Sequence, residues 1–288
     1  MSEYTDRPKF SEYKRNDSIP EEYDIVQLKM DGIWGCLVIK KGQWKIYSRT
    51  GNVKRKGKIA DKKVDVVLLG EFMFGSHWAH MRGLDGEFYI FDCLRYKGKD
   101  IKDRELSHRL VVSDFAWNEL KSELEWLDIL QNYDLEDWPH LWDEEIQAQG
   151  YEGLVFKDSS SSYADKDAWA RMKAIVEIEY ICHGFRPADE GTRYEGQVGA
   201  VIGTLHDKEV YVTCGGLTDD MRREFTDNPE PYMGQVFKAK GNTWYPSGSL
   251  RHPKFLHWRA DKEPIECTYD QIPLDIRESR DKWKSVSG

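Results

Sequence analysis

The chain has 288 residues, 40% hydrophobic and 13% aromatic, which is enough to bury a core in one large or two modest domains and excludes wholesale disorder. No apolar run approaches the roughly 18 residues of a spanning helix, and the charged start MSEYTDRPKF has no apolar leader segment, so we expect a cytoplasmic protein. Five scattered cysteines form no CxxC pair and indicate neither a zinc site nor a disulfide framework.

The net charge of −9 (42 Lys and Arg against 51 Asp and Glu) argues mildly against a nucleic-acid partner, but the charge is unevenly distributed. Ten basic residues lie between Lys40 and Lys63, where Asp61 is the only acid, whereas residues 119–145 are strongly acidic. A chain polarised in this way can present a basic face to phosphate despite its acidic total.

The first part of the chain predicts strands interrupted by two helices. After a polar arm over residues 1–22, strands are predicted over 25–29, 33–40, 44–48, 64–74, 87–94, 152–157 and 169–180. Helical spacing predicts a helix over 103–120, and Pro139 opens a second one over 140–149, which Gly150 ends.

Beyond residue 175 the pattern changes to short strands separated by glycine turns, over 177–184, 196–205, 209–214 and 234–239. That spacing predicts a small β-barrel. We therefore expect a domain boundary near Val176, with one domain over 1–176 and a second over 177–288.

Lys29 ends the first predicted strand, and Asp31-Gly32 follows it as a turn before the second strand. Taken alone, a K-x-D-G pattern is weak evidence for a nucleophile, because these residue types are common and the pattern arises by chance. The polar residues of the other predicted strands decide its meaning.

Two glutamates interrupt apolar strands, Glu71 in LLGEF and Glu152 in GYEGLV. A buried carboxylate needs a cation, a metal or a hydrogen-bond partner, and a structural salt bridge explains either glutamate as well as a functional site does.

Cations and aromatic residues occupy the neighbouring strands. Alternation places Trp169, Arg171 and Lys173 on one face, and two cations beside a nucleophilic lysine disfavour its ammonium form and can hold phosphate. Arg49, in the turn SRTG, is also placed to meet phosphate, and Phe91, before Asp92, could stack on a base.

Together and in this order, these stretches resemble the ATP-dependent DNA ligases of the nucleotidyltransferase superfamily, most closely the small bacteriophage and viral enzymes. The resemblance runs from Lys29 to Lys262. Its parts are KxDG at 29–32, SRTG at 48–51, the motif III glutamate Glu71, the aromatic–acid pair Phe91-Asp92, the motif IV pair Glu152-Gly153, motif V at 169–173, and motif VI at 246–253 and 259–262.

The resemblance implies an α+β fold, with a nucleotidyltransferase (ATP-grasp-like DNA ligase) domain of antiparallel sheets and flanking helices followed by a small all-β OB-fold barrel. It also implies the sealing of nicks in duplex DNA. The lysine takes AMP from ATP, AMP passes to a DNA 5′-phosphate, and the 3′-OH attacks to form the phosphodiester. The expected partner is nicked double-stranded DNA. We expect a monomer that does not bind membranes.

In the roles that the resemblance implies, Lys29, Asp31 and Lys173 are catalytic. Glu71 and Glu152 face Mg²⁺ or Mn²⁺, since hard cations prefer oxygen ligands. Phe91 stacks on adenine, and Gln27 reads the adenine edge. The other ATP-binding residues hold the ribose, phosphate or pyrophosphate: Arg49, Glu71, Arg171, Lys173, Arg251, Arg259, Asp261 and Lys262.

The basic stretch that follows Arg49 is predicted to contact the DNA backbone, because its cations would release counterions from the phosphates. The residues concerned are Lys54, Arg55, Lys56 and Lys58. The loop over 240–250 is expected to help clamp the duplex.

Three positions depart from the family pattern. Trp34 stands where the family usually has Arg, so a contact near the nick is expected to be missing or supplied elsewhere. Gln27 replaces a common Glu and can still accept a hydrogen bond from the adenine amine. Arg171 replaces Lys, which keeps the charge and gains bidentate geometry.

Other members of the superfamily are the nearest alternatives, namely an RNA ligase or an mRNA capping enzyme. The motif VI stretch inside an OB-like domain favours a DNA ligase over an RNA ligase, and a capping enzyme would need guanine selectivity. A non-catalytic OB-fold protein that binds nucleic acid is a remote alternative, because it has no use for Lys29 together with Arg171 and Lys173.

Overall fold

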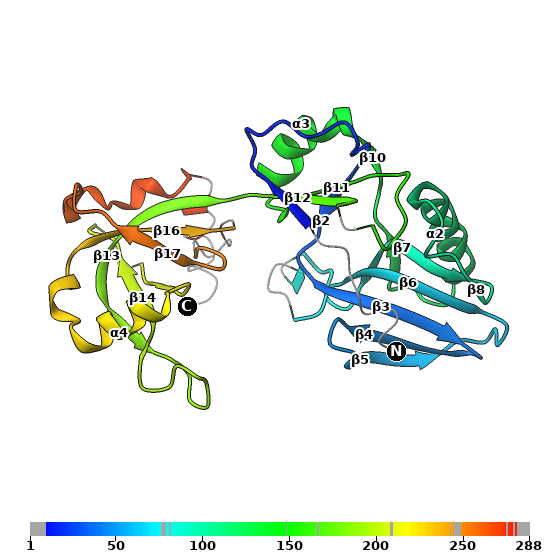
Figure 1. Ribbon diagram of the computed structural model, residues 1–288, viewed down its shortest axis with the longest axis horizontal. Helices are drawn as coiled ribbons and strands as arrows, with labels where there is room; N and C mark the ends of the chain where they lie inside the picture. The colour runs from blue at the N-terminus through cyan, green and yellow to red at the C-terminus, as the bar shows by residue number, and fades with distance from the viewer. Residues whose placement is uncertain are drawn as a thin grey trace. The chain divides into compact units, whose positions relative to one another are not determined.

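The computed structural model describes residues 10–75, 79–80, 82–147, 149–165, 167–207, 210–242, 244, 249–274, 276–278 and 280. The chain divides into two compact units, unit 1 from Met1 to Lys173 and unit 2 from Ala174 to Gly288 (Figure 1). Within the described ranges, no helix is long and apolar enough to cross a membrane.

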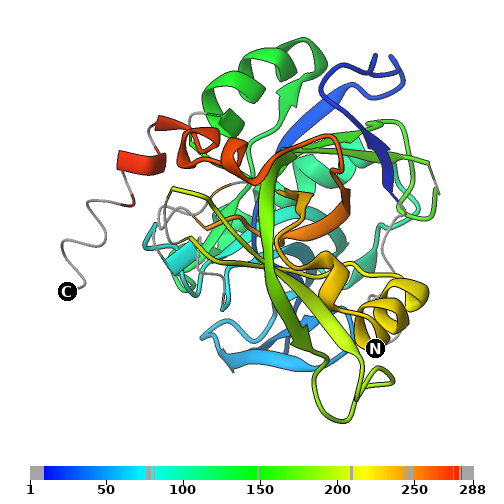
Figure 2. The same cartoon turned by 90° about the vertical axis from the view of Figure 1, so that its left-hand side faces the viewer.

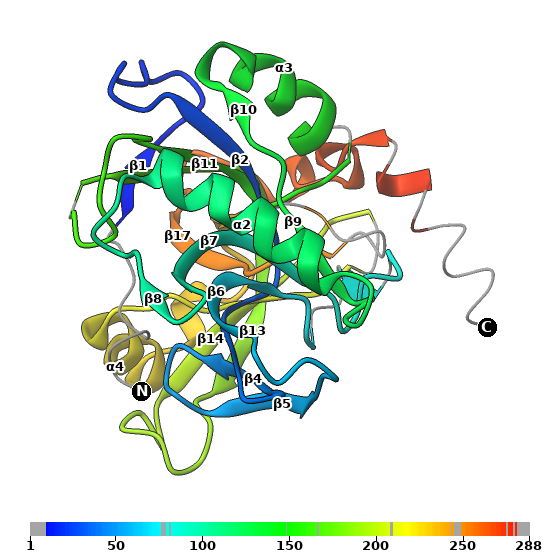
Figure 3. The same ribbon diagram turned by 90° about the vertical axis from the view of Figure 1, so that its right-hand side faces the viewer.

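Unit 1 contains a large sheet with the strand order β5-β4-β3-β6-β7-β8, and a short strand, β9, pairs with β7 in parallel. Helix α2 (Leu106–Leu120) lies across one face of this sheet (Figure 3), where Ile46 and Leu68 pack with Val112 and Ala116. The strands are β3 (Ile33–Lys40), β4 (Gln43–Ser48), β5 (Val53–Lys58), β6 (Asp65–Phe72), β7 (Phe88–Tyr96), β8 (Lys99–Asp100) and β9 (Leu127–Ile129).

A small sheet packs on the opposite face of the large one. Cys36, Tyr47 and Leu69 of the large sheet share a buried cluster with Trp169 of the small sheet. The strands of the small sheet, in order, are β1 (Phe10–Tyr13), β12 (Trp169–Lys173), β11 (Gly153–Lys157), β2 (Ile25–Lys29) and β10 (Tyr133–Asp134). Only the β1–β12 pair is parallel.

A helical segment follows β10 and packs against the small sheet. It consists of a 3₁₀ turn (η2, Leu135–Asp137), α3 (Trp138–Leu141) and a π-helical turn (η3, Trp142–Gln147). Trp138 meets Phe156 of β11 edge to face, with ring centroids 6.3 Å apart. The helix expected over 140–149 therefore begins earlier and is irregular.

The turn after Lys29 carries the chain from one sheet to the other, because β2 belongs to the small sheet and β3 to the large one. Gly32 is not in the left-handed region that a hairpin turn would require. A Cβ atom at this position would lie 2.6 Å from the carbonyl oxygen of Phe72. The glycine is therefore needed because two backbones approach each other closely.

Several other elements differ from the sequence expectation. Residues 10–13, expected in a polar arm, form β1 at the edge of the small sheet, and the basic run 53–58 forms the edge strand β5. β1 has only four residues and β5 is almost entirely basic, so local periodicity does not reveal either strand. Lysines at a sheet edge are a common guard against aggregation. The strand expected over 169–180 is two strands, β12 and β13, which belong to different units.

Unit 2 (Figure 2) contains an antiparallel sheet. Its strand order is β15-β14-β13-β16-β17, and its buried apolar residues form a core cluster. Phe237 and Val201, both fully buried, lie in that core. A β-bridge between Gly215, next to β15, and Lys254 of β17 brings the two edges of this sheet together at one point, so the sheet is curled. The strands are β13 (Val176–Pro187), β14 (Val198–Thr204), β15 (Val212–Cys214), β16 (Val236–Gly241) and β17 (Lys254–Trp258).

The helical elements of unit 2 are α4 (Asp219–Asp227) and three 3₁₀ turns, η4 (Glu230–Tyr232), η5 (Pro264–Glu266) and η6 (Tyr269–Gln271). Thr218 caps α4 by accepting a hydrogen bond from the amide of Met221 at 3.2 Å. Residues 243 and 245–248 of the loop expected to clamp DNA, and residues 246–248 of motif VI, lie outside the described residues.

Candidate active site

Three neighbouring strands of the small sheet place one lysine on each side of a glycine. Lys29 of β2 pairs with Gly153 of β11, and Gly153 pairs with Lys173 of β12. Gln27 and Arg171 occupy the corresponding positions two residues earlier on their strands. Because side chains alternate along a strand, these four polar residues share one face of the sheet.

Glu152 holds the two lysines together. Its Oε2 accepts a hydrogen bond from Lys29 Nζ at 2.6 Å, and its Oε1 pairs with Lys173 Nζ at 2.7 Å. The residue is only 6% exposed. Burial by itself would raise the pKa of Glu152, but the two ammonium groups outweigh that effect and lower the pKa below its ordinary value. The carboxylate is therefore ionised and oriented at neutral pH.

Gly153 makes this arrangement possible. Its φ is +155°, and a Cβ atom there would lie 2.0 Å from the carbonyl oxygen of Met172. Any side chain would push β11 away from β12 and separate Glu152 from Lys173. The Glu-Gly pair of the sequence therefore has a steric explanation.

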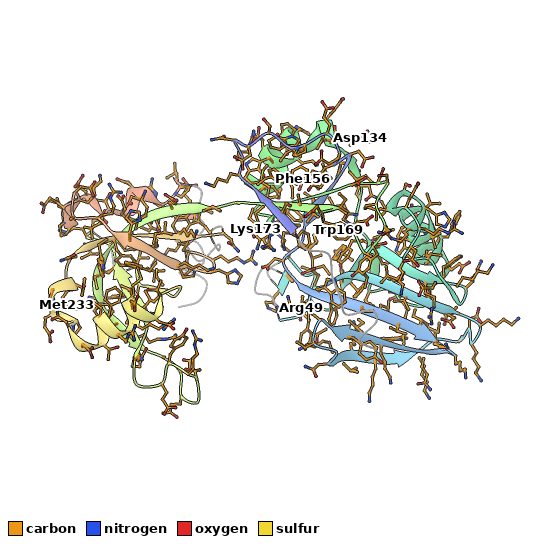
Figure 4. All side chains as sticks on the ribbon, viewed as in Figure 1. Arg49, Asp134, Phe156, Trp169, Lys173 and Met233 are labelled. Carbon is orange, nitrogen blue, oxygen red and sulfur yellow. The ribbon has the colours of Figure 1, made fainter. Side chains whose placement is uncertain are left out.

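An aromatic cluster adjoins this row of polar residues. Phe91 of β7 and Trp169 of β12 meet edge to face with ring centroids 5.7 Å apart, and Phe10 of β1 meets Trp169 in the same way at 5.8 Å. Phe91 is 9% exposed. Figure 4 shows Trp169 and Lys173 on β12 and Arg49 at the end of β4.

Sequence reasoning missed Lys157, which is buried beneath these rings. Its Nζ lies 4.0 Å from the ring centroid of Trp169 and 5.1 Å from that of Phe91, and it donates a hydrogen bond to the carbonyl oxygen of Phe91 at 3.1 Å. Burial lowers the pKa of Lys157 to about 7. The available signal in the sequence was a lysine directly after the apolar run 154–156.

Asp92, the acid of the aromatic–acid pair, is structural. It receives two hydrogen bonds from Arg109 of α2, from Nε at 2.9 Å and from Nη2 at 3.0 Å, and both residues are fully buried. Arg109 also donates to the carbonyl oxygen of Ser161 at 3.1 Å. The arginine was recognisable as a charged residue between apolar Leu106 and Leu110 on the helix.

Gln27 and Arg171 each have a partner in unit 1. Gln27 is buried and donates to Asn132 Oδ1 at 2.7 Å. Arg171 pairs with Glu12, its neighbour across the β1–β12 ladder, and its guanidinium lies 5.4 Å from the ring centroid of Phe10. The guanidinium thus faces the N-terminal strand, which sequence reasoning did not include in the site.

Glu71, Trp34 and Arg49 lie at one end of the large sheet. Trp34 of β3 pairs with Glu71 of β6, and the pairing of Gly35 with Ser48 brings Arg49 beside Trp34. Glu71 is half-buried and Arg49 is exposed at the end of β4. Asp31 lies in the turn between β2 and β3.

Among the residues with described positions, the acidic side chains do not form a metal site by themselves. No group of three or more His, Cys, Asp or Glu side chains with metal-binding geometry occurs in the part of the chain that the structure describes. Both oxygens of Glu152 face lysine ammonium groups. A cation would therefore need ligands from a bound molecule in addition to Glu71 and Glu152.

The predicted pyrophosphate residues all belong to unit 2. Arg259 pairs with Glu179 and with Asp261, with an Nη2–Oδ2 distance of 2.7 Å, and Lys262 pairs with Glu266 at 3.0 Å. Hydrogen bonds from Arg259 lower the pKa of Asp261.

Arg251 is only 2% exposed, and burial lowers its pKa to about 10. Its guanidinium is therefore largely shielded from solvent in this structure.

Unit 1 thus presents a lysine-centred site between two packed sheets. Comparisons with known proteins identify the family of this chain. The model of the RNA ligase family matches residues 22–175, more than half of the chain, and the chain belongs to this family.

Two curated relatives come from bacteriophages. The DNA ligase of Enterobacteria phage T3 is 30% identical over 150 residues, which cover 49% of this chain and 43% of that protein. The DNA ligase of Escherichia phage T7 is 26% identical over 171 residues, covering 49% and 46%. The chain therefore matches less than half the length of either relative.

Two solved structures share the fold. A structure from a structure–function study of Lig E DNA ligases has a TM-score of 0.61 and 17% identity, covering 88% of this chain and 99% of that one. The structure named Pmar-Lig_PreS3 has a TM-score of 0.61 and 18% identity, covering 88% and 68%.

Proposed function

We propose that this protein is an ATP-dependent DNA ligase that seals nicks in duplex DNA through a covalent lysyl-AMP intermediate. The observation that carries the proposal is the pair of ammonium groups, Lys29 and Lys173, held by one buried carboxylate across Gly153. The similarity of the chain to the DNA ligases of phages T3 and T7 supports DNA as the substrate.

In the first step the lone pair of Lys29 Nζ attacks the α-phosphorus of ATP, the bond to pyrophosphate breaks, and a phosphoramidate forms. Lys29 and Lys173 contact the same carboxylate, which fixes the attacking nitrogen beside a second cation that can hold phosphate. Glu152 stays ionised and keeps the reacting amine in place. Asp31 lies in the turn that follows Lys29, and this turn holds the end of β2 in position.

In the second step AMP passes from the nitrogen of Lys29 to an oxygen of the DNA 5′-phosphate. In the third step the 3′-oxygen attacks that phosphorus, and AMP leaves as the phosphodiester forms. Lys173 and Arg49 hold the phosphates, because such transfers depend mostly on positioning and on neutralising charge. Phe91 stacks on adenine, Gln27 reads its edge, and Glu71 binds the ribose or a cation.

Mg²⁺ or Mn²⁺ would be held by Glu71 and Glu152 together with phosphate oxygens of the substrate, and would supply neutralisation of phosphate charge.

We further propose that residues 1–176 are the nucleotidyltransferase domain and residues 177–288 an OB-fold domain, acting as a monomer in the cytoplasm. The curled antiparallel sheet of unit 2 supports the second assignment. Arg259, Asp261 and Lys262 then orient pyrophosphate in the first step, with Arg251 exposed by rearrangement. Closure of one domain over ATP and later reopening would allow this.

Sealing of RNA is the second candidate, because the matching family model is that of RNA ligases. Matched nicked duplexes with DNA or RNA on either side of the nick separate the two activities, and GTP in place of ATP tests for a capping-type enzyme. Preferential sealing of RNA strands would reassign the substrate.

Covalent labelling tests the chemistry directly. Wild-type protein incubated with α-labelled ATP and Mg²⁺ should retain label after denaturation, and Lys29→Ala should lose it because the attacking nitrogen is gone. Lys99→Ala, which changes an exposed lysine on β8, serves as the control and should label normally. An unlabelled wild-type protein would refute the enzyme class, and a labelled Lys29→Ala protein would refute the nucleophile.

A further inference from the structure

One face of the large sheet carries lysines from three adjacent strands near its free edge. Lys45 of β4 lies directly opposite Lys56 of β5, and Gln43 lies between Lys58 of β5 and Lys40 of β3. Residues opposite each other on paired strands point to the same side of the sheet. We call Lys40, Lys45, Lys56 and Lys58 together the lysine face.

This arrangement of lysines destabilises the protein when no anionic ligand is bound. Like charges directly opposite each other on paired strands are destabilising, and Lys45 and Lys56 form such a pair. Lys40 pairs with Asp65 at 3.4 Å, but among the residues with described positions no carboxylate lies within ion-pair distance of Lys45, Lys56 or Lys58. An anionic ligand would remove the repulsion.

The register separates Arg55 from this group. Arg55 lies opposite Ile46 and so points to the other face of the sheet. Its guanidinium lies 4.9 Å from the ring centroid of Trp126, and Nη1 donates to the carbonyl oxygen of Gly86 at 2.8 Å. Arg55 is therefore a packing residue, unlike its lysine neighbours. Lys54 lies at the irregularity between the paired positions 53 and 55.

The lysine face continues the face that carries part of the candidate site. Alternation along β3 places Trp34, Cys36, Val38 and Lys40 on one side, and Trp34 is the partner of Glu71. The six residue steps from Trp34 to Lys40 span about 20 Å at ~3.3 Å per residue. That length corresponds to about six base pairs at ~3.4 Å each.

We propose that the lysine face binds the phosphate backbone of the duplex, about half a helical turn from the nick. This inference rests on the proposed function, since it takes DNA to be the substrate. Protection of the sheet edge would explain lysines on β5, but it does not explain Lys45 on the inner strand β4 directly opposite Lys56. Counterion release makes binding by such a face steeply dependent on salt.

The test compares two triple variants of the full chain that carry the same change in net charge. Lys45→Ala/Lys56→Ala/Lys58→Ala removes three lysines of the lysine face. Lys97→Ala/Lys99→Ala/Lys121→Ala removes three from the opposite edge of the large sheet and the end of α2. The dissociation constant for a nicked DNA duplex is measured for each variant across a salt series, beside wild type and Arg55→Ala.

The lysine-face variant should flatten the slope of log K against log salt by about 0.9 for each lost phosphate contact, up to about 2.7. The control triple and Arg55→Ala should keep the wild-type slope. The melting temperature of the lysine-face variant should equal or exceed that of wild type, because a like-charge pair is removed, whereas Arg55→Ala should melt lower.

An unchanged slope in the lysine-face variant, or an equal change in the control triple, would overturn the inference. This failure is distinguishable from failure of the proposed function. If the wild-type protein forms the covalent adenylate and seals nicked DNA, but the lysine-face variant keeps the wild-type salt slope, only the proposed role of the lysine face is refuted. Wild-type protein that does neither refutes the ligase assignment.

Discussion

At the scale of single residues, the site depends on the lack of a side chain at one glycine. Gly153 has no Cβ, and this allows β11 to approach β12 closely enough for Glu152 to reach Lys29 and Lys173 at once. Two ion pairs on one carboxylate align the lysines more strongly than strand geometry alone. The glycine is thus as necessary for the site as the charged residues.

Gly153→Ala should destabilise unit 1 by about 2 kcal/mol or more, because the new methyl group would lie 2.0 Å from a backbone oxygen and φ is +155°. Urea unfolding followed by tryptophan fluorescence measures the change. Gly184→Ala is the matched control, since no atom lies within 4 Å of its added Cβ and its φ is not in the left-handed region. Equal stability of the two variants would contradict the steric explanation.

Lys157 shows a second effect at this scale. A lysine surrounded by aromatic rings and a backbone carbonyl oxygen gains cation–π attraction but loses hydration, and the balance brings its pKa down to about 7. Its hydrogen bond to Phe91 ties β11 to β7 beneath the residue proposed to stack on adenine. The small and large sheets are therefore joined at the base of the site.

At the scale of elements, α2 is docked by a buried ion pair as well as by apolar packing. Arg109 on the helix and Asp92 on β7 are both fully buried and form two parallel hydrogen bonds. This pair fixes the helix at one position along β7, immediately next to Phe91.

Arg109→Ala should lower the free energy of unfolding by about 3–5 kcal/mol, because Asp92 would remain as a buried charge without its partner. Chemical denaturation monitored by circular dichroism gives the value. Arg104→Ala, which removes an exposed arginine just before the helix, should change the stability by less than about 0.5 kcal/mol. A loss below about 1 kcal/mol in Arg109→Ala would show that the pair does not determine docking.

At the scale of the whole molecule, the residues proposed to act on ATP are divided between two units with separate cores. Lys29, Glu152 and Lys173 belong to unit 1, whereas Arg259, Asp261 and Lys262 belong to unit 2. Within unit 2, Glu179 and Asp261 hold Arg259 in place. Because the two groups lie in different units, a mutation of Arg259 tests its proposed role in the first step without changing the residues around Lys29.

Arg259→Ala should reduce formation of the covalent adenylate from ATP at least about tenfold, while retaining the sealing of a nick whose 5′-phosphate already carries AMP. The reason is that pyrophosphate is present only in the first step. Both reactions are measured on the full chain, with circular dichroism to confirm folding and Arg223→Ala, an exposed arginine of α4, as the control. Equal loss in both reactions would refute a role confined to the first step.

The sequence by itself determined the positions of the motifs and most strands, because turn chemistry and side-chain alternation act over a few residues. The strands around Lys29, Glu71 and Glu152 lie close to where local patterns predict them. The helix predicted over 103–120 is present as α2, shortened at its start. The family resemblance extended this local information to a proposed chemistry.

Only the tertiary structure decided which residues meet. Pairing of strands far apart in sequence brings Glu152 to both lysines, turns Arg171 toward Glu12 and buries Arg109 and Lys157. The same register separates Arg55 from the lysine face. Local periodicity does not specify such contacts, because they depend on which strands are neighbours and on the packing of one sheet against the other.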